Sequence, residues 1–300
     1  MRISRVEVAG GDWLLYLGAR VSRSSKPVEG MIGEATPKRM ELLFRKLLVW
    51  GHLSVFEHSL IRVWIEDDPE EVKSRLFHWK FVELSEDEGL LSMNPRVAVE
   101  MIERGDPEVR ELAKRVLLHF PILSRAVGLS SEGGGPGVGF RVELSSEEVE
   151  DIWVHMLLSS PWPDPRHGFH AFLVEGISRV CSHQLVRHRA LSFTQQSQRV
   201  SQVSGYYLPG HLDAELRRRM EREVERSLKT YYGLVDAGVE MEDARYILPQ
   251  ACTTRILISG RDSAWIHFIR LRAAPDAQRE IRLVAQMIQR LSGMEPSVGD

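Results

Sequence analysis

The sequence contains only two cysteines, Cys181 and Cys252, and neither belongs to a Cys-x-x-Cys pair. This scarcity excludes a disulfide framework and gives no support to a structural zinc site. We therefore expect a protein without a bound metal ion. A low cysteine content is also typical of a cytoplasmic location.

The sequence also lacks long apolar runs. No stretch approaches the roughly 20 consecutive apolar residues that a membrane-spanning helix requires. The opening segment MRISRVEVAGGDWLLYLGARVS has only short apolar runs, so we expect neither a targeting segment nor a membrane partner. The hydrophobic content of 43% is ample for the core of one large or two ordinary globular domains.

A strong excess of either charge is missing too, because the formal net charge is −3. An anionic ligand must therefore be met by a local cluster of cations rather than by the field of the whole molecule. Lysine is scarce, with seven of the 39 basic residues, so such a cluster consists mainly of arginine. The planar guanidinium group suits phosphate, carboxylate or the edge of a heterocycle.

Local periodicity predicts a mixed α and β fold. Residues 3–10 alternate with the period of a strand, whereas residues 36–52 begin with Thr-Pro and carry apolar residues at helical spacing. Residues 56–69 are rich in β-forming side chains, and residues 70–84 and 94–120 return to helical periodicity. A strand, a helix and a second strand are thus expected to precede a helical region.

The segment SSEGGGPGVG at residues 130–139 is the strongest break in the chain. It is rich in glycine, but it lacks the Lys-Ser or Lys-Thr ending of a phosphate-binding loop, and no dinucleotide fingerprint surrounds it. We interpret it as a linker near the middle of the chain.

The second half of the chain carries an ordered set of polar side chains. Residues 169–176 are predicted to form a strand, and residues 177–189 (ISRVCSHQLVRHR) a helix. The core side of this helix comprises Ile177, Val180, Cys181 and Leu185. The polar side comprises Arg179, His183 and Arg187 at spacings of four residues, flanked by Gln184 and His188. These groups either cap the helix dipole as a solvated cationic face or belong to a ligand site.

The segment that follows favours a ligand site. Residues 190–199 (ALSFTQQSQR) are polar without being strongly charged. Their hydroxyl and amide groups can both donate and accept hydrogen bonds, as on Ser192, Thr194, Gln195, Gln196 and Ser197. This composition suits the recognition of a nucleobase.

These residues resemble those of a known family. Arg187-His188-Arg189, seven further residues and Ser197 are similar to the RHR-x7-S signature of flavin-dependent thymidylate synthases. Two more blocks resemble this family, GHLSVFEH at residues 51–58 and the segment from ARYILPQACTTR to REIRLVAQ at residues 244–286. The resemblance implies an FAD-dependent methyltransferase that converts dUMP to dTMP. It would take its carbon from methylenetetrahydrofolate, while NADPH would reduce the FAD.

The resemblance also implies which residues bind dUMP. They are Gln184, Arg187, Gln195, Gln196, Ser197, Gln198, Arg199, Arg245 and Arg272. Arg272 is expected to hold the pyrimidine and to favour its ionisation at N3, which makes carbon 5 nucleophilic. Ser197 is expected to position the ring, because no base partner for it is visible. Arg272 and Ser197 are thus the predicted catalytic residues, although Arg272 taken alone is more typical of a surface arginine at a helix end.

The flavin contacts that the family implies are present in part. They are His52, Ser54, Arg187, His188, Arg189, Gln195 and His267. Where the family has Asn-x-Arg, this chain has Arg261-Asp262-Ser263, and the aromatic residue expected after Arg199 is Val200. These substitutions remove two expected flavin ligands and one stacking surface.

The family blocks lie unusually far apart, since more than 100 residues separate the FEH motif at residues 56–58 from the RHR motif. We predict a synthase-like part at residues 1–66, a mainly helical insertion at residues 67–165, and a second synthase-like part at residues 166–300. The resemblance implies an α/β (α+β) subunit in which helices flank a twisted sheet.

The insertion could also be a degenerate repeat. Residues 92–121 resemble residues 259–296, and in this interpretation Asn94 and Arg96 bind the flavin in place of Arg261 and Ser263. Two unrelated helical hairpins would explain the likeness equally well. The family implies a homotetramer whose sites are each built from several chains, and a dimer would suffice if the repeat is real.

Other functions compete with the synthase. A degenerate relative could bind a nucleotide without flavin and act as a binding or scaffold subunit, in line with Arg261, Ser263 and Val200. A nucleic-acid-binding protein could use the charged segment at residues 214–229, but its Glu and Arg residues lie at pairing distance and favour a self-paired helix face. A metal-dependent hydrolase is least favoured, because the chain has no HExxH motif.

Overall fold

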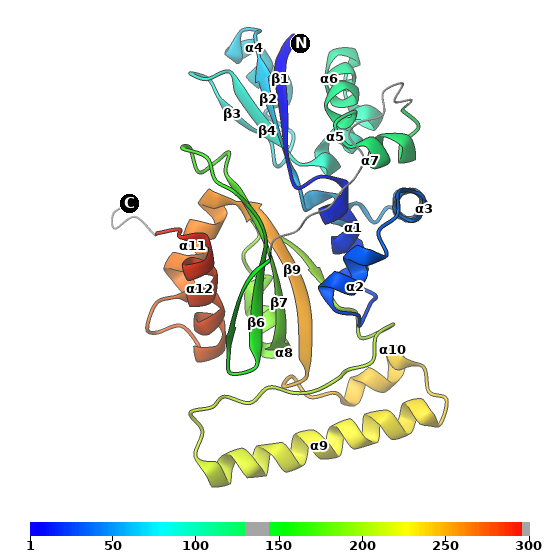
Figure 1. The fold of residues 1–300 in the computed structure, drawn as a ribbon, viewed down its shortest axis with the longest axis vertical. Coiled ribbons are helices and arrows are strands. Elements are labelled where there is room, and N and C mark those ends of the chain that lie inside the picture. The colour runs from blue at the N-terminus through cyan, green and yellow to red at the C-terminus, as the bar shows by residue number, and fades with distance from the viewer. Residues whose placement is uncertain (130–143, 296–300) are drawn as a thin grey trace.

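The computed structural model describes residues 1–129 (the first half) and 144–295 (the second half). The predicted linker at residues 130–139 lies outside the described residues. The described chain forms two antiparallel sheets flanked by helices, an α+β arrangement (Figure 1). In this part of the chain no helix is long and apolar enough to cross a membrane. The mixed α and β composition predicted from the sequence is confirmed.

The first sheet consists of residues of the first half. Its strands are β1 (Ile3–Ala9), β2 (Leu60–Ile65), β3 (Glu83–Ser85) and β4 (Leu90–Met93), in the order β1-β2-β4-β3. Its core residues Ile61, Val63 and Leu91 pack with the apolar sides of helices. These are α3 (Pro37–Val49), α4 (Pro69–Leu76), α5 (Pro95–Arg104), α6 (Pro107–Leu117) and α7 (Pro121–Ala126). The predicted boundary after residue 66 falls within this sheet.

Helix starts in the first half follow the capping signals of the sequence. The helix predicted behind Thr36 and Pro37 begins there, and Thr36 Oγ1 accepts a hydrogen bond from the backbone N–H of Arg39. The helix predicted over residues 70–84 ends at Leu76, however, and residues 83–85 form the edge strand β3. A strand of three residues is too short to establish a period of its own in the sequence.

The second sheet is larger and is covered on both faces. Its strands are β5 (Ser145–Val149), β6 (Ile152–Ser160), β7 (Phe169–Ser178), β8 (Ser192–Gln195) and β9 (Thr253–Arg261), in the order β5-β6-β7-β9-β8. Phe172 and Ile258 on one face pack against α8 (Arg179–Leu185), α11 (Asp262–Arg272) and α12 (Arg279–Ser292). Leu173 and Leu257 on the other face pack against α1 (Asp12–Val21) and α2 (Val28–Gly33) of the first half.

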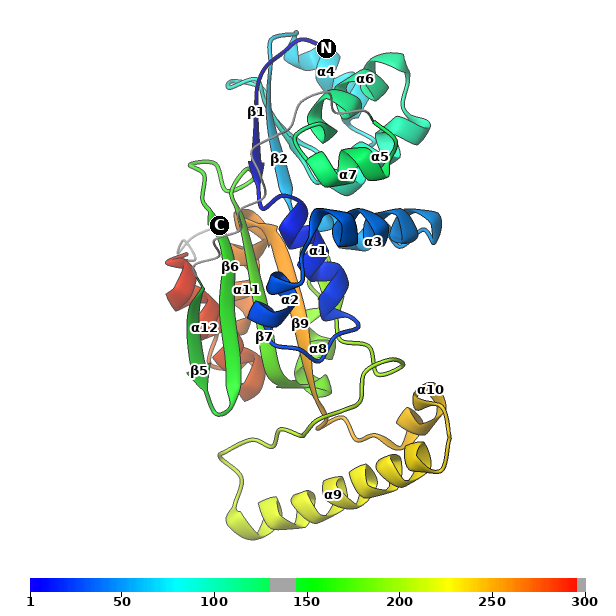
Figure 2. The same cartoon turned by 45° about the vertical axis from the view of Figure 1, so that its right-hand side comes forward.

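A long arm extends from the second sheet (Figures 1 and 2). It consists of α9 (Ala214–Asp236), α10 (Met241–Ala244) and the short helix η2 (Arg245–Ile247), which lie between β8 and β9 in the sequence. The arm is anchored by Leu228 and Tyr231 of α9, which pack in one cluster with Cys252. On the surface of α9, Arg217 pairs with Glu221 at 3.1 Å between Nε and Oε1, in agreement with a self-paired charged face.

A bulge turns β7 into α8 and so sets the position of the RHR motif. Gly176 has a φ of 78°, and a Cβ atom there would lie 2.2 Å from the carbonyl oxygen of Asp151. Ser178 then caps α8, since its Oγ accepts from the backbone N–H of Cys181 at 3.1 Å. Both the backbone N–H and the hydroxyl of Ser178 donate to the buried Glu280 of α12 at 2.6 Å. The start of α8 is therefore fixed to α12.

The core assignments made for this helix are correct except at one position. Ile177, Cys181 and Leu185 are fully buried. Val180 is 40% exposed, because residue 177 still belongs to β7 and the helix begins only at Arg179. The buried positions change where the strand ends and the helix begins. A single helical period drawn from Ile177 through Val180 therefore assigns Val180 to the wrong face.

Candidate active site

The RHR motif forms a turn between α8 and β8. The backbone N–H of His188 donates to the carbonyl of Leu185 at 3.1 Å, and that of Leu191 donates to the carbonyl of His188 at 2.9 Å. The ring of His188 is only 9% exposed and lies edge-on to Phe268 of α11, with ring centroids 5.0 Å apart. The turn is thereby held against α11, while Arg187 and Arg189 are exposed.

His188 and Arg272 form the central contact of this site. Arg272 Nε donates to His188 Nε2 at 2.9 Å. Burial, with further contributions from the Arg272 and His267 charges, lowers the pKa of His188 to about 4. His188 is therefore neutral at pH 7 and accepts at Nε2, which leaves its proton on Nδ1. The bond fixes the guanidinium of Arg272 without using its two terminal nitrogens.

A cavity of about 280 Å³ opens beside this contact and is called the RHR cavity below. It is lined by Arg187, His188, Arg189, Ala190, Leu191, Ala264, His267, Leu271 and Arg272. Its described lining contains three arginines, two imidazoles and no carboxylate, so the cavity attracts an anion. The structure thus brings the RHR motif, from the middle of the chain, together with residues of the family block near its end, at residues 244–286.

Other residues predicted for dUMP gather at the base of the arm rather than in the RHR cavity. Arg199 pairs with Glu242 at 2.7 Å, and Arg245 Nε donates to the carbonyl of Glu242 at 3.1 Å. Ser197 Oγ accepts from the backbone N–H of Arg199, and the backbone N–H of Ser197 donates to Ser22 of the first half. Ser197, Arg199 and Arg245 therefore form a second cationic group.

The predicted glutamines make contacts within the second half. Gln184 Nε2 lies 3.5 Å from Oε1 of Gln278, and Gln195 Nε2 donates to Thr254 Oγ1 at 3.3 Å. Gln196 is held through its backbone N–H, which donates to the carbonyl of Arg255. Gln198 is partly buried. None of these four glutamines lines the RHR cavity.

The flavin contacts predicted in the first half also lie outside the RHR cavity. His52 and Ser54 are exposed at the start of the short helix η1 (Leu53–Glu57). Asn94 Oδ1 accepts from the backbone N–H of Val97 at 3.0 Å and caps α5. Arg96 is paired with Glu57 at 2.5 Å and with Glu100 at 2.8 Å.

Glu57 links this group to the RHR turn, and sequence reasoning did not single it out. Glu57 Oε2 accepts from Ser192 Oγ of β8 at 2.6 Å. A small cavity of about 30 Å³ is lined by Glu57 and Asn94 of the first half and by Ala190 and Ser192 of the second. Glu57 belongs to the FEH motif, so its place in that block was the available signal.

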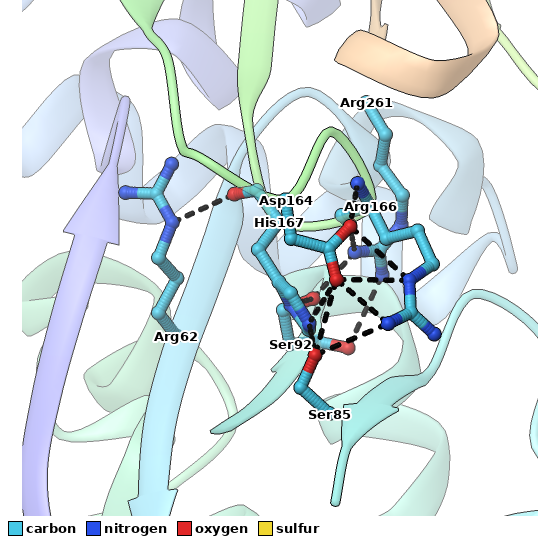
Figure 3. A network of polar contacts seen from close by, with 7 residues as sticks. All are labelled: Arg62, Ser85, Ser92, Asp164, Arg166, His167 and Arg261. Carbon is cyan, nitrogen blue, oxygen red and sulfur yellow. Dashed lines mark hydrogen bonds and ion pairs between the residues drawn. The ribbon is translucent and has the colours of Figure 1, made fainter. Parts of the chain in front are cut away.

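Arg261, which replaces the expected asparagine, joins the two halves. Its guanidinium donates to both the hydroxyl and the carbonyl of Ser92 and to the carbonyl of Arg166 (Figure 3). It also donates to the carbonyl of Phe81. Burial lowers its pKa to about 10, so it is still charged at pH 7. Arg261 is thus committed to binding the first half and has no role in the RHR cavity.

Two buried histidines hold the same interface. His58 bonds through Nδ1 to Ser259 Oγ and through Nε2 to Thr194 Oγ1, both at 2.8 Å. His167 bonds through Nδ1 to Ser92 Oγ at 2.8 Å and through Nε2 to Ser85 Oγ at 3.0 Å (Figure 3). Each histidine therefore reaches from its own half to two hydroxyl groups of the other half.

These histidines make stability dependent on pH. Burial lowers the pKa of His58 to about 3 and is the main cause that lowers the pKa of His167 to about 4, against 6.5 in an unfolded chain. Below pH 6.5 the unfolded chain binds protons that the folded chain does not, so the free energy of unfolding falls as the pH drops towards 4. We expect a loss of about 1–2 kcal/mol per histidine by pH 5.

Chemical denaturation of the wild type and of His167→Asn at several pH values checks this expectation. Taking the difference between the two proteins cancels the opposite trend of Asp12, whose pKa burial raises to about 6. The variant should show a shallower fall in the free energy of unfolding between pH 6.5 and 5. Equal slopes in the two proteins would contradict a neutral His167.

Comparison with known proteins shows which family this site belongs to. The family model described as thymidylate synthase complementing protein matches residues 144–296. A Geobacter sulfurreducens protein named flavin-dependent thymidylate synthase is 36% identical over 193 residues, which cover 61% of this chain and 83% of the relative.

Two further relatives of the same name are matched over a smaller share of their own length. The Sulfurisphaera tokodaii protein is 35% identical over 159 residues, or 51% of this chain and 62% of the relative. The Thermococcus onnurineus protein is 41% identical over 127 residues, or 40% of this chain and 52% of the relative. The matched family model and the RHR cavity lie in the same half of the molecule. This chain therefore belongs to the family of flavin-dependent thymidylate synthases.

Proposed function

We propose that the protein catalyses the reductive methylation of dUMP to dTMP, with FAD as cofactor, NADPH as reductant and methylenetetrahydrofolate as carbon donor. The observation that carries this proposal is the bond between Arg272 and the neutral His188 at the edge of a cationic cavity. A pyrimidine whose N3 loses its proton is an anion in its reactive form, and a fixed guanidinium stabilises that form.

The chain's own residues would divide the work. Arg272 would contact the pyrimidine with its terminal nitrogens. His188 would hold the guanidinium in place by accepting the hydrogen bond from Arg272 Nε. His188, Arg189 and His267 would hold the flavin, and the cationic lining without a carboxylate fits its negatively charged phosphates. Bound FAD, once reduced by NADPH, would supply the hydride, which no amino acid side chain can carry.

Arg199 and Arg245 would bind the phosphate of dUMP in place of Glu242. At the base of the arm Arg199 already pairs with this carboxylate, and Arg245 donates to the backbone carbonyl of Glu242; both lie away from the RHR cavity of their own chain. We therefore propose a homo-oligomer in which the arm of one copy contributes to the site of another. Ser197, beside Arg199, would position the ring in the same shared site.

Release of tritium from 5-labelled dUMP tests the proposal. The purified protein should release tritium to water when FAD, NADPH and methylenetetrahydrofolate are all present, and omission of the folate should abolish formation of dTMP. The protein should also show the absorbance of bound flavin. Failure to take up added FAD, with dUMP binding retained, would instead support the degenerate binding subunit.

A further inference from the structure

The two halves of the chain share one connectivity. The first sheet has the order β1-β2-β4-β3, and the last four strands of the second sheet have the order β6-β7-β9-β8. Every neighbouring pair in both sets is antiparallel. Two helices follow each set directly, α5 and α6 after β4, and α11 and α12 after β9. The correspondence therefore extends over six elements in the same order.

Strand register makes the correspondence specific to single residues. Ser92 of β4 lies opposite Arg62 of β2 and Glu83 of β3. Ser259 of β9 lies opposite Ala171 of β7 and Ser192 of β8. The register thus matches Ser92 with Ser259, Arg62 with Ala171 and Glu83 with Ser192.

Contacts between the halves obey the same correspondence. His58 of the first half bonds to Ser259 and Thr194, and His167 of the second half bonds to Ser92 and Ser85. These partners are matched pairs, since Ser85 ends β3 opposite Leu90 and Thr194 lies at the same register step of β8, opposite Leu257. Reciprocal contacts of this kind are typical of the interface between two copies related by a two-fold axis. The first half thus corresponds to the second half in connectivity, register and contacts, as a diverged copy would.

The matched positions include the active-site turn. The RHR motif lies between α8 and β8, and its counterpart between α4 and β3 is His78-Trp79-Lys80. On the helix that follows, Ala264, His267 and Leu271 of α11 correspond to Val97, Glu100 and Arg104 of α5.

These counterparts also line a cavity. It measures about 330 Å³, against about 280 Å³ for the RHR cavity. Its lining residues are His78, Trp79, Lys80, Phe81, Arg96, Val97, Glu100 and Arg104. A pocket of matching position and similar size has thus been kept in the copy, although most of its side chains have changed. We call it the Trp79 cavity.

We infer that the Trp79 cavity binds the phosphate-bearing adenosine group of a nucleotide without catalysing a reaction on it. The second site is inferred on the basis of the proposed function, in which the RHR cavity binds nucleotides. The position of His188 is taken by Trp79 and that of Arg272 by Gly105, so the arginine–imidazole contact has no counterpart. The copy keeps a pocket but lacks the group that would activate a pyrimidine.

The lining favours an adenosine phosphate over dUMP. The indole of Trp79 provides a stacking surface, with the ring of His78 beside it at 5.3 Å between centroids. Glu100 can accept a hydrogen bond from an exocyclic amino group, which adenine has and uracil lacks. Lys80 and Arg104 are exposed cations that can bind phosphate. Arg96 is held between Glu57 and Glu100 and keeps the carboxylate of Glu100 in place.

Calorimetric titration of the full-length protein with ADP tests this site. ADP should bind, and the double variant Lys80→Ala/Arg104→Ala should bind it at least about tenfold more weakly, because two charge-assisted hydrogen bonds to phosphate are removed. Both side chains are exposed, so thermal unfolding of this variant should match the wild type. Trp79→Ala should weaken ADP binding by a similar factor, and dUMP should not compete.

The matched control is the double variant Arg187→Ala/Arg272→Ala in the RHR cavity. It should abolish tritium release and keep ADP binding, whereas Lys80→Ala/Arg104→Ala should keep tritium release. Competition by FAD or NADPH would identify a dinucleotide as the source of the adenosine group. ADP binding without such competition would identify a free nucleotide as that source. Absence of ADP binding up to millimolar concentration would overturn the second site. Loss of ADP binding in the Arg187→Ala/Arg272→Ala variant alone would also overturn the second site. Absence of tritium release with ADP binding intact would refute only the proposed function.

Discussion

Replacement of Arg272 by alanine is expected to lower the rate of tritium release by about 100- to 1,000-fold, the usual cost of removing a fixed group that stabilises developing negative charge. Arg272 is held by His188 at 2.9 Å, so its guanidinium needs no reorganisation when substrate binds. The measurement is the initial rate at saturating dUMP, together with the Kd of dUMP. The larger part of the effect should appear in kcat.

Two further variants make this prediction specific. Arg272→Lys keeps the charge but loses the planar fork, so most of the activity should still be lost. Arg290→Ala, on the neighbouring α12, removes an exposed arginine that pairs with Glu147, and it should leave the rate unchanged. A rate within tenfold of the wild type for Arg272→Ala would contradict a catalytic role.

Replacement of Arg261 by methionine is expected to lower the free energy of unfolding by about 2–4 kcal/mol. Methionine fills a similar volume but leaves four acceptors without their donor, two on Ser92 and one each on Phe81 and Arg166. Three of these acceptors, on Ser92 and Phe81, belong to the first half, so the contact between the two halves should weaken. Urea denaturation followed by far-UV circular dichroism measures the change.

A surface arginine again provides the control for stability. Arg290→Ala removes an exposed ion pair and should cost less than about 1 kcal/mol. If Arg261→Met is no more destabilising than Arg290→Ala, then the bonds of Arg261 across the halves contribute nothing measurable. FAD binding should be unaffected by Arg261→Met, because the side chain does not line the RHR cavity.

Periodicity predicted the long elements of the fold and missed the short ones. The strand at residues 3–9 and the helix that starts behind Thr36 have several repeats of their period, and both are found as expected. The strand β3 has three residues and follows a helix without a glycine or proline between them. Its pairing with β4 is a tertiary effect that local sequence does not encode.

The sequence predicted the part of the candidate site that depends on contacts between side chains of recognisable motifs. Arg187, His188 and Arg272 belong to recognisable blocks, and they come together in one cavity. The partners of Arg261 were not predictable, because three of its four acceptors are backbone carbonyls, which every residue has. The likeness of residues 92–121 to residues 259–296 suggested a repeat from the sequence, but the shared strand order of the two halves was not visible there.

The place of Arg261 opposite the first half has a consequence for how this molecule can evolve. Between two identical subunits every mutation occurs twice, so an arginine introduced at this position would appear on both sides of the contact. Here the matched position is Asn94, which keeps its separate task of capping α5. In the inferred duplication each half can change alone, so the pairing of Arg261 with Ser92 can arise without its counterpart between Asn94 and Ser259.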